Sequence, residues 1–330
     1  MRRSTGLPLL GAAVALLGGL LVVPRADAAI GSPCVPGTAY GNPLPATAVT
    51  ATAIRTGFPF LEGPVWHAAS GTLLLSEMRN ATGREAVQPA SVLRFTPPAT
   101  VETFIAQSGS NGLALSPDGS TLLAATHDQR TVSSYRLSDG GRGVVAANFG
   151  GRRFNSPNDL TVRADGTVYF TDPSFQRGNR ADEQGRRTGV YRVKDGVVSL
   201  VDGTLAQPNG IVLSPDERTL YVGGGGSNAI YAYPVAADGS TGARRTFASV
   251  RSPDGATVDC AGNIYWASYN DGRVHVFDPA GRVLGTIAAG RNATNAAFGG
   301  ADGRTLYVTA GTAGNFGLYS VRLNVPGSPF

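Results

Sequence analysis

The stretch "QPNGIVLSPDERTLYVGG", residues 207–224, has the pattern of two short strands joined by a turn. Apolar residues run from Ile211 to Leu213, Ser-Pro-Asp-Glu follows as a turn, and Leu220 to Val222 form the return strand. Asn209 stands out, because a polar amide opens a strand that otherwise has the composition of a buried one. The chain repeats this arrangement, so the role of Asn209 becomes the role of a set of equivalent residues.

Six segments of the chain share the pattern. They are "EGPVWHAASGTLLLSE" from Glu62, "NGLALSPDGSTLLAAT" from Asn111, "NDLTVRADGTVYFTDP" from Asn158, "NGIVLSPDERTLYVGG" from Asn209, "DGATVDCAGNIYWASY" from Asp254 and "NAAFGGADGRTLYVTA" from Asn295. Asp-Gly or a related turn between two strands is a strong hairpin signal, and further strand pairs lie between the copies. A repeat of about 40–50 residues with four strands is typical of a propeller blade. Six copies therefore predict an all-β fold, a six-bladed β-propeller.

The propeller is expected to occupy residues 51–330 as a single domain, since no linker divides this region. The 45 glycines and 21 prolines favour a strand-and-turn protein over a helical one. Residues 29–50 are expected to form an irregular N-terminal arm. The ring is expected to close by pairing of residues 51–55 with "GLYSVRL", residues 317–323.

Residues 1–28 have the features of a signal peptide. A basic start precedes an apolar run at residues 7–23, and "ADA" at 26–28 fits the small-residue rule for cleavage near Ala28. The alternative is a membrane anchor, although the run is at the short end for a span. We expect export to the periplasm or the extracellular space and no membrane insertion of the mature protein.

Charge and cysteine content limit the partners. The net charge is +5 without a basic stripe, so we expect no nucleic-acid partner. Cys34 and Cys260 either form one disulfide, which an exported chain permits, or are two unrelated thiols. We expect the protein to be a monomer.

The six segments begin with residues that all carry side-chain oxygen. In a propeller these residues converge at one rim of the central channel: Glu62, Asn111, Asn158, Asn209, Asp254 and Asn295. Buried carboxylates and amides are costly unless satisfied, and a shared cation satisfies several at once. Oxygen ligands favour calcium over magnesium or manganese, and the three histidines are not spaced for zinc. The alternative is that these residues only cap loops and turns, above all Asn111 and Asn295.

A second layer follows at 14–16 residues after each start. It contains His127, Asp172 and the glycine tract 223–226. His127 is a candidate for proton transfer or a hydrogen-bonded rim residue. Asp172 is expected to orient a metal ligand from behind. The glycines leave room for a substrate or form a flexible loop.

The motifs together resemble the regucalcin/gluconolactonase family, in its exported gluconolactonase-like branch. The matching stretches are "EGPVW" at 62–66, "RFNSPNDL" at 153–160, "FTDP" at 170–173, "QPNGIVLSPDERTLYV" at 207–222, "PDGATVDCAGNIYWASYNDGRV" at 253–274 and "FGGADGRTLYVT" at 298–309. The resemblance implies a six-bladed propeller with one divalent metal at its axis and hydrolysis of sugar lactones.

Carried over by position, the resemblance implies Glu62, Asn209 and Asp254 as metal ligands, with Asn158 bound directly or through water. Calcium is preferred, and zinc, manganese, magnesium and ferrous iron remain alternatives. The implied mechanism is Lewis-acid activation of the lactone carbonyl and of water. Asp254 is expected to be the catalytic base, with His127 as second choice.

Four residues are expected to contact the lactone: Asn111, Asn158, Arg153 and Arg130. Arg130 ends "THDQR", residues 126–130, which matches the family only in part because Thr126 replaces a glutamate. The glycine tract 223–226 is a second departure. The alternatives to a lactonase are a hydrolase of other esters or organophosphates at the same site, and a non-catalytic ligand-binding propeller.

Overall fold

The computed structural model describes Met1, residues 33–80 and residues 87–328. The expected signal peptide, with its cleavage site near Ala28, lies outside the described residues apart from Met1. The described chain is built from strands β1 to β27. In this part of the molecule, no helix is long and apolar enough to span a membrane.

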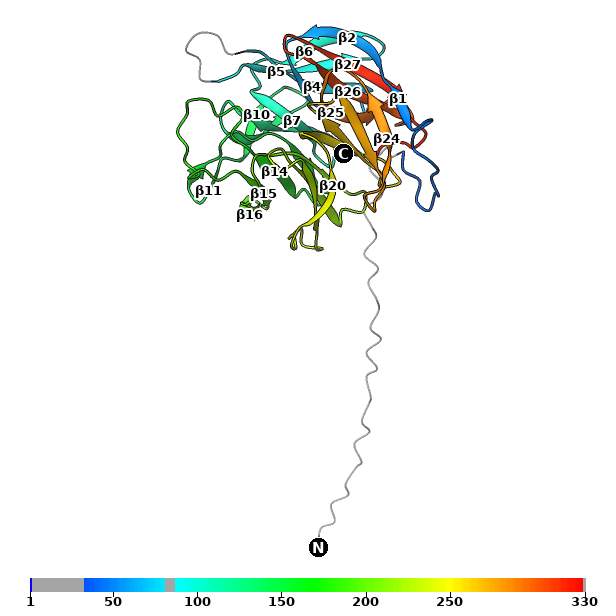
Figure 1. The fold of residues 1–330 in the computed structure, drawn as a ribbon. Coiled ribbons are helices and arrows are strands. Elements are labelled where there is room, and N and C mark those ends of the chain that lie inside the picture. Colours follow the sequence, from blue (N-terminus) through cyan, green and yellow to red (C-terminus); the bar gives the residue numbers. More distant parts are fainter. Residues whose placement is uncertain (2–32, 81–86, 329–330) are drawn as a thin grey trace.

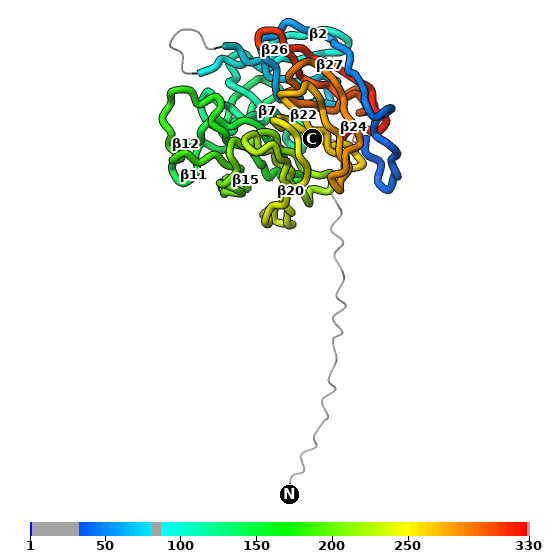
Figure 2. Tube along the Cα trace, in the orientation of Figure 1, coloured from blue at the N-terminus to red at the C-terminus, as the bar shows by residue number. Residues whose placement is uncertain are grey.

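Six sheets of four or five strands form the blades. Within each blade, the strands lie side by side from the centre of the ring to its outer edge. Blade 1 contains β3 (Leu61–His67), β4 (Thr72–Met78), β5 (Ala90–Thr96) and β6 (Thr100–Ile105); blade 2 contains β7 (Ser110–Leu115), β8 (Thr121–Thr126), β9 (Thr131–Arg136) and β10 (Arg142–Ala146); blade 3 contains β13 (Leu160–Val162), β14 (Val168–Asp172), β15 (Gly189–Lys194) and β16 (Val197–Asp202). Blade 4 contains β17 (Pro208–Leu213), β18 (Thr219–Gly224), β19 (Ala229–Pro234) and β20 (Arg245–Ser249); blade 5 contains β21 (Pro253–Val258), β22 (Ile264–Ser268), β23 (Arg273–Phe277), β24 (Val283–Ala288) and β1 (Ala48–Thr50); blade 6 contains β25 (Asn292–Gly299), β26 (Thr305–Thr312), β27 (Asn315–Arg322) and β2 (Thr52–Phe58). A separate pair, β11 (Asn148–Phe149) and β12 (Arg152–Arg153), lies at the periphery (Figure 2).

The innermost strands form a closed ring. Each contacts the next in the order β3, β7, β13, β17, β21, β25 and back to β3. The blades follow one another around the centre in chain order (Figure 1). The predicted all-β, six-bladed propeller is confirmed.

The core consists of six apolar clusters, each shared by two adjacent blades. Leu73 and Leu74 illustrate the reason, because successive residues of a strand face opposite sides of the sheet. Leu73 packs in the cluster that contains Tyr307 of blade 6, whereas Leu74 packs in the cluster that contains Leu113 of blade 2. A single blade cannot bury both faces, so the ring must close.

Ring closure places the first long strand beside the last. β2 pairs antiparallel with β27, with Ala53 opposite Tyr319 and Arg55 opposite Leu318. The predicted pairing of residues 51–55 with residues 317–323 is therefore confirmed. Blade 6 is built from both ends of the described chain.

The N-terminal arm is not irregular throughout, as the sequence had suggested. Its last residues form β1, which pairs parallel with β24 and gives blade 5 a fifth strand. The outer edge of β24 offers unpaired backbone groups, and the arm satisfies them. Gly285 permits this close approach, because a Cβ there would lie 2.3 Å from the Thr47 carbonyl oxygen. Leu44 of the arm is buried in the core shared by blades 5 and 6.

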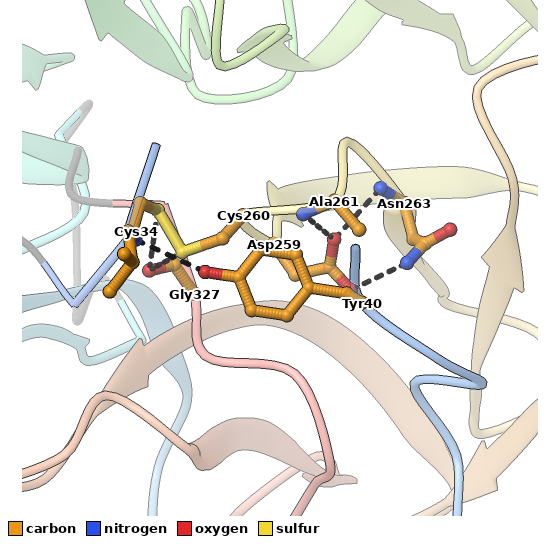
Figure 3. Close-up of a disulfide and its surroundings, with 8 residues drawn as sticks. Cys34, Tyr40, Asp259, Cys260, Ala261, Asn263 and Gly327 are labelled. Atoms are coloured by element: carbon orange, nitrogen blue, oxygen red, sulfur yellow. Dashed lines mark hydrogen bonds between the residues drawn. A yellow bond between two sulfur atoms is a disulfide. The ribbon is translucent and has the colours of Figure 1, made fainter. Parts of the chain in front are cut away.

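A disulfide joins the arm to blade 5. Cys34 and Cys260 are bonded, with their Cα atoms 5.2 Å apart (Figure 3). Asp259 orders the turn that carries Cys260, since its carboxylate accepts hydrogen bonds from the backbone amides of Ala261 and Asn263. The C-terminal segment crosses the same place, where Cys260 N donates to Pro326 O. Of the two alternatives that the sequence left open, the structure contains the disulfide.

Candidate functional site

The polar residues that open the inner strands lie at irregularities in the strand pairing. On β3 the register shifts between Glu62 and Val65, and on β21 it shifts between Pro253 and Ala256. Similar shifts occur at the starts of β7, β17 and β25. A β-bulge takes a residue out of the ladder and re-aims its side chain. Repeated bulges therefore distinguish these positions from ordinary strand residues.

Close contacts between neighbouring blades bring these positions into a ring. A Cβ on Gly63 would lie 2.3 Å from Asn111 O, and one on Gly210 would lie 1.9 Å from Asp254 O. A Cβ on Gly255 would lie 2.0 Å from Asn295 Cγ. Glycine is required where two backbones approach this closely. The glycine that follows the ring residue in blades 1, 2, 4 and 5 thus lets the next blade pack against it.

Asn295 closes the ring. Its Nδ2 donates to Glu62 Oε2 at 3.5 Å, which links blade 6 to blade 1. Its Oδ1 accepts a hydrogen bond from Ala296 N at 2.8 Å. The sequence had favoured a purely structural role for Asn295, and this contact shows that it also touches a carboxylate of the ring.

Asp159 is the site residue that sequence reasoning missed. It occupies the position that is glycine in blades 1, 2, 4 and 5, and it is only 7% exposed. Its Oδ1 accepts from Leu160 N at 2.9 Å, and the space beside Gly112 is filled by this carboxylate. The signal was available, because "NDLT" departs from the Asn-Gly or Asp-Gly of the neighbouring copies.

Three buried carboxylates consequently share the axis. Burial and then the charge of Asp159 raise the pKa of Glu62 to about 8. Burial raises the pKa of Asp159 to about 7, although hydrogen bonds partly offset this. Burial and then the charges of Glu62 and Asp159 raise the pKa of Asp254 well above its usual range. The charge of one carboxylate raises the pKa of another only at short range, so Glu62 and Asp254 each lie near Asp159.

This donor set fits a hard divalent cation better than a soft one. Within the residues that the structure describes, no three histidine, cysteine, aspartate or glutamate side chains form a ready-made metal site by themselves. The axial set combines carboxylates with amides, and Asn209 contributes a side-chain hydrogen bond to Asp254. Carboxylate and amide oxygens are the ligands that calcium takes. Glu62, Asn158, Asn209 and Asp254 could hold such an ion.

The backbone of Asn158 is held by its own blade and by blade 2. Its backbone N–H donates to Thr171 O at 2.9 Å, and its carbonyl accepts from Gly112 N at 2.7 Å. Asp172 accepts from the backbone amides of Asn155 and Ser156, each at 2.8 Å. Asp172 therefore shapes the segment that leads into Asn158, which supports the orienting role expected for it. Burial raises the pKa of Asp172 to about 7.

His127 is buried in the second layer. Its Nε2 donates to Gln88 O at 2.7 Å, since a carbonyl can only accept. Nδ1 is then left as an acceptor, and it has no hydrogen-bond partner among the described residues. Burial is the main cause that lowers the pKa of His127, which favours the neutral ring. A neutral imidazole with a free lone pair can accept a proton.

The two arginines expected to contact substrate occupy different places. Arg130 is 2% exposed, its Nε donates to Phe154 O, and its Nη1 donates to Ala181 O at 3.1 Å. Arg153 lies on β12 with its side chain 63% exposed, and its Nε contacts Glu183 Oε1 at 2.7 Å. The structure thus brings Arg130 beside blade 3 but leaves Arg153 on the surface, apart from the ring.

Asn111 and the glycine tract 223–226 are the remaining residues that the sequence assigned to the site. Asn111 is 2% exposed on β7 and belongs to the ring. Gly223 is needed for packing, because a Cβ there would lie 2.8 Å from Trp266 Cζ2. Gly225 lies next to Phe175, which is 47% exposed. Only the outer part of the tract therefore borders open surface.

Comparisons with known proteins agree with this architecture. The profile of the SMP-30/gluconolactonase/LRE-like region matches residues 60–312. The chain belongs to this family. A gluconolactonase of Zymomonas mobilis is 32% identical over 290 residues, covering 78% of this chain and 78% of the relative. The pentonolactonase XacC of Haloferax volcanii is 32% identical over 283 residues, covering 82% and 86%.

Solved structures of similar proteins have the same fold. A gluconolactonase of Xanthomonas campestris superposes with a TM-score of 0.70 at 30% identity, covering 88% of this chain and 99% of that one. Regucalcin of Agrobacterium tumefaciens, described as a calcium-binding protein, superposes with a TM-score of 0.69 at 21% identity, covering 86% and 99%. The second similarity shows the propeller fold alone.

Proposed function

We propose that this protein is a lactonase that opens a sugar lactone at the propeller axis with the help of a divalent cation. Family membership and two relatives named as sugar lactonases support the reaction class. The observation that carries the site is the set of three buried carboxylates, Glu62, Asp159 and Asp254, with raised pKa values. Such a set is stabilised by a bound cation.

The proposed ligands are Glu62, Asn158, Asn209 and Asp254, and calcium is the preferred ion. When bound, the cation would polarise the lactone carbonyl and stabilise the negative charge that develops on its oxygen. Asp254 is the proposed general base, because its carboxylate lies at the axis and is oriented by Asn209. His127 is the second candidate, with Nδ1 as the accepting atom.

The remaining groups position the substrate. Asn111 and Asn158 present amides at the same rim and are proposed to bind hydroxyl groups of the sugar. Asp172 keeps Asn158 in place through the backbone amides of Asn155 and Ser156. Arg153 is not included in this set, because its side chain is exposed and paired with Glu183.

Hydrolysis of D-glucono-1,5-lactone, followed by acid release with and without calcium, tests the proposal. We expect calcium-dependent activity in the unaltered protein. Asp254→Asn should lower kcat by about 100-fold or more, the range typical of a lost general base. Glu102→Gln on β6, where the carboxylate pairs with Arg94 at the surface, is the matched control and should retain activity.

Two outcomes contradict the proposal. One is an absence of calcium-dependent turnover of every lactone tested, and the other is full activity in Asp254→Asn. Organophosphates tested in parallel distinguish a lactonase from a hydrolase of other esters. Metal content measured on each variant separates loss of the base from loss of the ion.

A further inference from the structure

A long connection between β14 and β15, residues 173–188, lies against the turn between β8 and β9, residues 127–130. Arg180 of the connection donates from Nη1 to His127 O at 2.7 Å and to Asp128 O at 2.9 Å. In the opposite direction, Arg130 donates to Ala181 O. These bonds tie blades 2 and 3 together beside the axial ring.

Positive charge gathers in this contact. Arg130, Arg153, Arg177 and Arg180 face Asp182 and Glu183, and Asp172 also attracts Arg130. Glu183 is shared, because it lies 2.7 Å from Arg153 Nε and 3.5 Å from Arg130 Nη1. The hydrogen bonds described for Arg180 all run to backbone carbonyls of Gln176, Arg177, His127 and Asp128. Asp128, which also lies near Arg180, is paired with Arg142, so these four guanidinium groups face three carboxylates and one positive charge is left over.

Four buried polar atoms in the same contact lack a hydrogen-bond partner within the described chain. Two are donors, Arg130 Nη2 and Arg177 Nε, and two accept, Gln176 Oε1 and His127 Nδ1. Arg130 is 2% exposed, so the free donor is not simply directed to bulk water. A buried polar group without a partner is unfavourable, and a bound molecule would satisfy these four atoms.

The contact adjoins the axial site through Asn155. Arg177 Nη1 donates to Asn155 Oδ1 at 3.0 Å, and Asn155 Nδ2 donates to Asp172 Oδ2 at 3.1 Å. Asn155 precedes Asn158 by three residues on the same rim segment. Gln176 N also donates to Ser156 Oγ at 3.2 Å. Arg177 and Arg130 therefore belong to the hydrogen-bond network around Phe154 and Asn155, the residues that lead into Asn158.

We propose that this contact is an anion subsite and that the preferred substrate is a sugar lactone with an acidic group, such as phosphate or carboxylate, distant from the lactone carbonyl. The inference rests on the proposed lactonase function. The free guanidinium donors take the anionic oxygens, which accept two N–H groups well. Hydroxyl groups of the sugar donate to Gln176 Oε1 and His127 Nδ1.

Binding of open-chain acids tests the subsite without depending on catalysis. Calorimetry compares gluconate with 6-phosphogluconate on the calcium-loaded protein and on three variants. We expect the unaltered protein to bind 6-phosphogluconate at least about tenfold more tightly than gluconate. One charge-assisted hydrogen bond to the phosphate accounts for a gain in affinity of this size. Arg177→Gln should remove most of this preference, and Arg177→Lys, which keeps the charge, should restore part of it.

Arg94→Gln on β5 is the matched control, since Arg94 pairs with Glu102 in blade 1. It should keep the preference for the phosphorylated acid. Equal affinity for the two acids in the unaltered protein overturns the subsite, and so does an Arg177→Gln variant that weakens both acids equally. If neither D-glucono-1,5-lactone nor its 6-phosphate is hydrolysed while the Arg177-dependent preference persists, the subsite stands and the lactonase proposal fails.

Discussion

Three carboxylates are buried at the axis, where loss of hydration makes their charged form unfavourable. Glu62, Asp159 and Asp254 are each less than a tenth exposed, and each has a raised pKa. In an isolated chain these groups would be hydrated and ionised at neutral pH. The fold therefore keeps them together at a cost that a cation can offset, which is the physical reason to expect a metal there.

Without metal, the protein should lose stability as the pH rises. A carboxyl group whose folded pKa is raised binds its proton more tightly in the folded state, so stability falls between the unfolded pKa and the folded one. For Asp159 this window runs from its ordinary value of 3.8 to about 7. In the presence of a chelator, the Tm of the unaltered protein should fall between about pH 5 and about pH 8. In Asp159→Asn this fall should be smaller by roughly 5 °C.

Thermal unfolding in chelator and in calcium measures this effect. Calcium should raise Tm most at the higher pH, because binding requires ionised carboxylates. Asp302→Asn is the control, since Asp302 is an exposed partner of Arg322 and its pKa is lowered. If Tm has the same pH dependence in Asp159→Asn and in the unaltered protein, the pKa of Asp159 is not raised by burial at the axis.

Bulged inner strands are the elements that turn a structural repeat into a site. Each combines a polar residue that leaves the ladder with a small residue that the next blade covers, as with Asn209 and Gly210. Bulges re-aim side chains, and glycine allows the backbones to meet. Blade 3 departs from this scheme with Asp159, and blade 6 departs from it with Ala296. The ring therefore acquires a third carboxylate at one blade only.

Gly210→Ala should disturb both packing and metal binding. The new Cβ would lie 1.9 Å from Asp254 O, so the backbone of β21 must shift. We expect a loss of about 1–3 kcal/mol in the free energy of unfolding, as for other overpacked sites, and weaker calcium affinity. Gly41→Ala, where a Cβ meets nothing within 4 Å, is the matched control. Denaturant titration measures the free energy of unfolding, and calorimetry measures the calcium affinity. If both are unchanged in Gly210→Ala, the prediction is wrong.

The whole molecule is closed at two places. β2 completes blade 6, and the Cys34–Cys260 disulfide fastens the arm that follows the edge of blade 5. Both closures act on segments far apart in sequence, since the disulfide spans 226 residues. A cross-link over a long loop restricts the unfolded chain. Such a bond persists in an oxidising compartment, and we propose that the protein is exported to one.

Removal of the disulfide should lower stability without abolishing the site. Cys34→Ser with Cys260→Ser should reduce the free energy of unfolding by about 2–5 kcal/mol, because the unfolded chain gains freedom. Calcium affinity should be retained, since Cys260 lies in the turn after β21, beyond the opposite end of that strand from Asp254. Denaturant titration with and without reductant checks this. If reductant leaves the free energy of unfolding of the unaltered protein unchanged, the prediction is wrong.

Much of the fold could be predicted because a propeller is periodic. The spacing of Glu62, Asn209 and Asp254 within their repeats was enough to number the blades and to place these residues at one rim. Closure of β2 onto β27 followed from the same count. The arm was the exception, because β1 pairs with an outer edge that no repeat in the sequence describes.

The sequence by itself determined the strand period, the number of blades and the oxygen-bearing residues that open them, because each depends on neighbours along the chain. Only the tertiary structure decided that Asp159 joins the axis, that Cys34 meets Cys260, and that an arginine-rich connection covers His127. These contacts join residues of different blades, or an arm and a blade. Their distances depend on how the sheets pack around the ring, which no local pattern encodes.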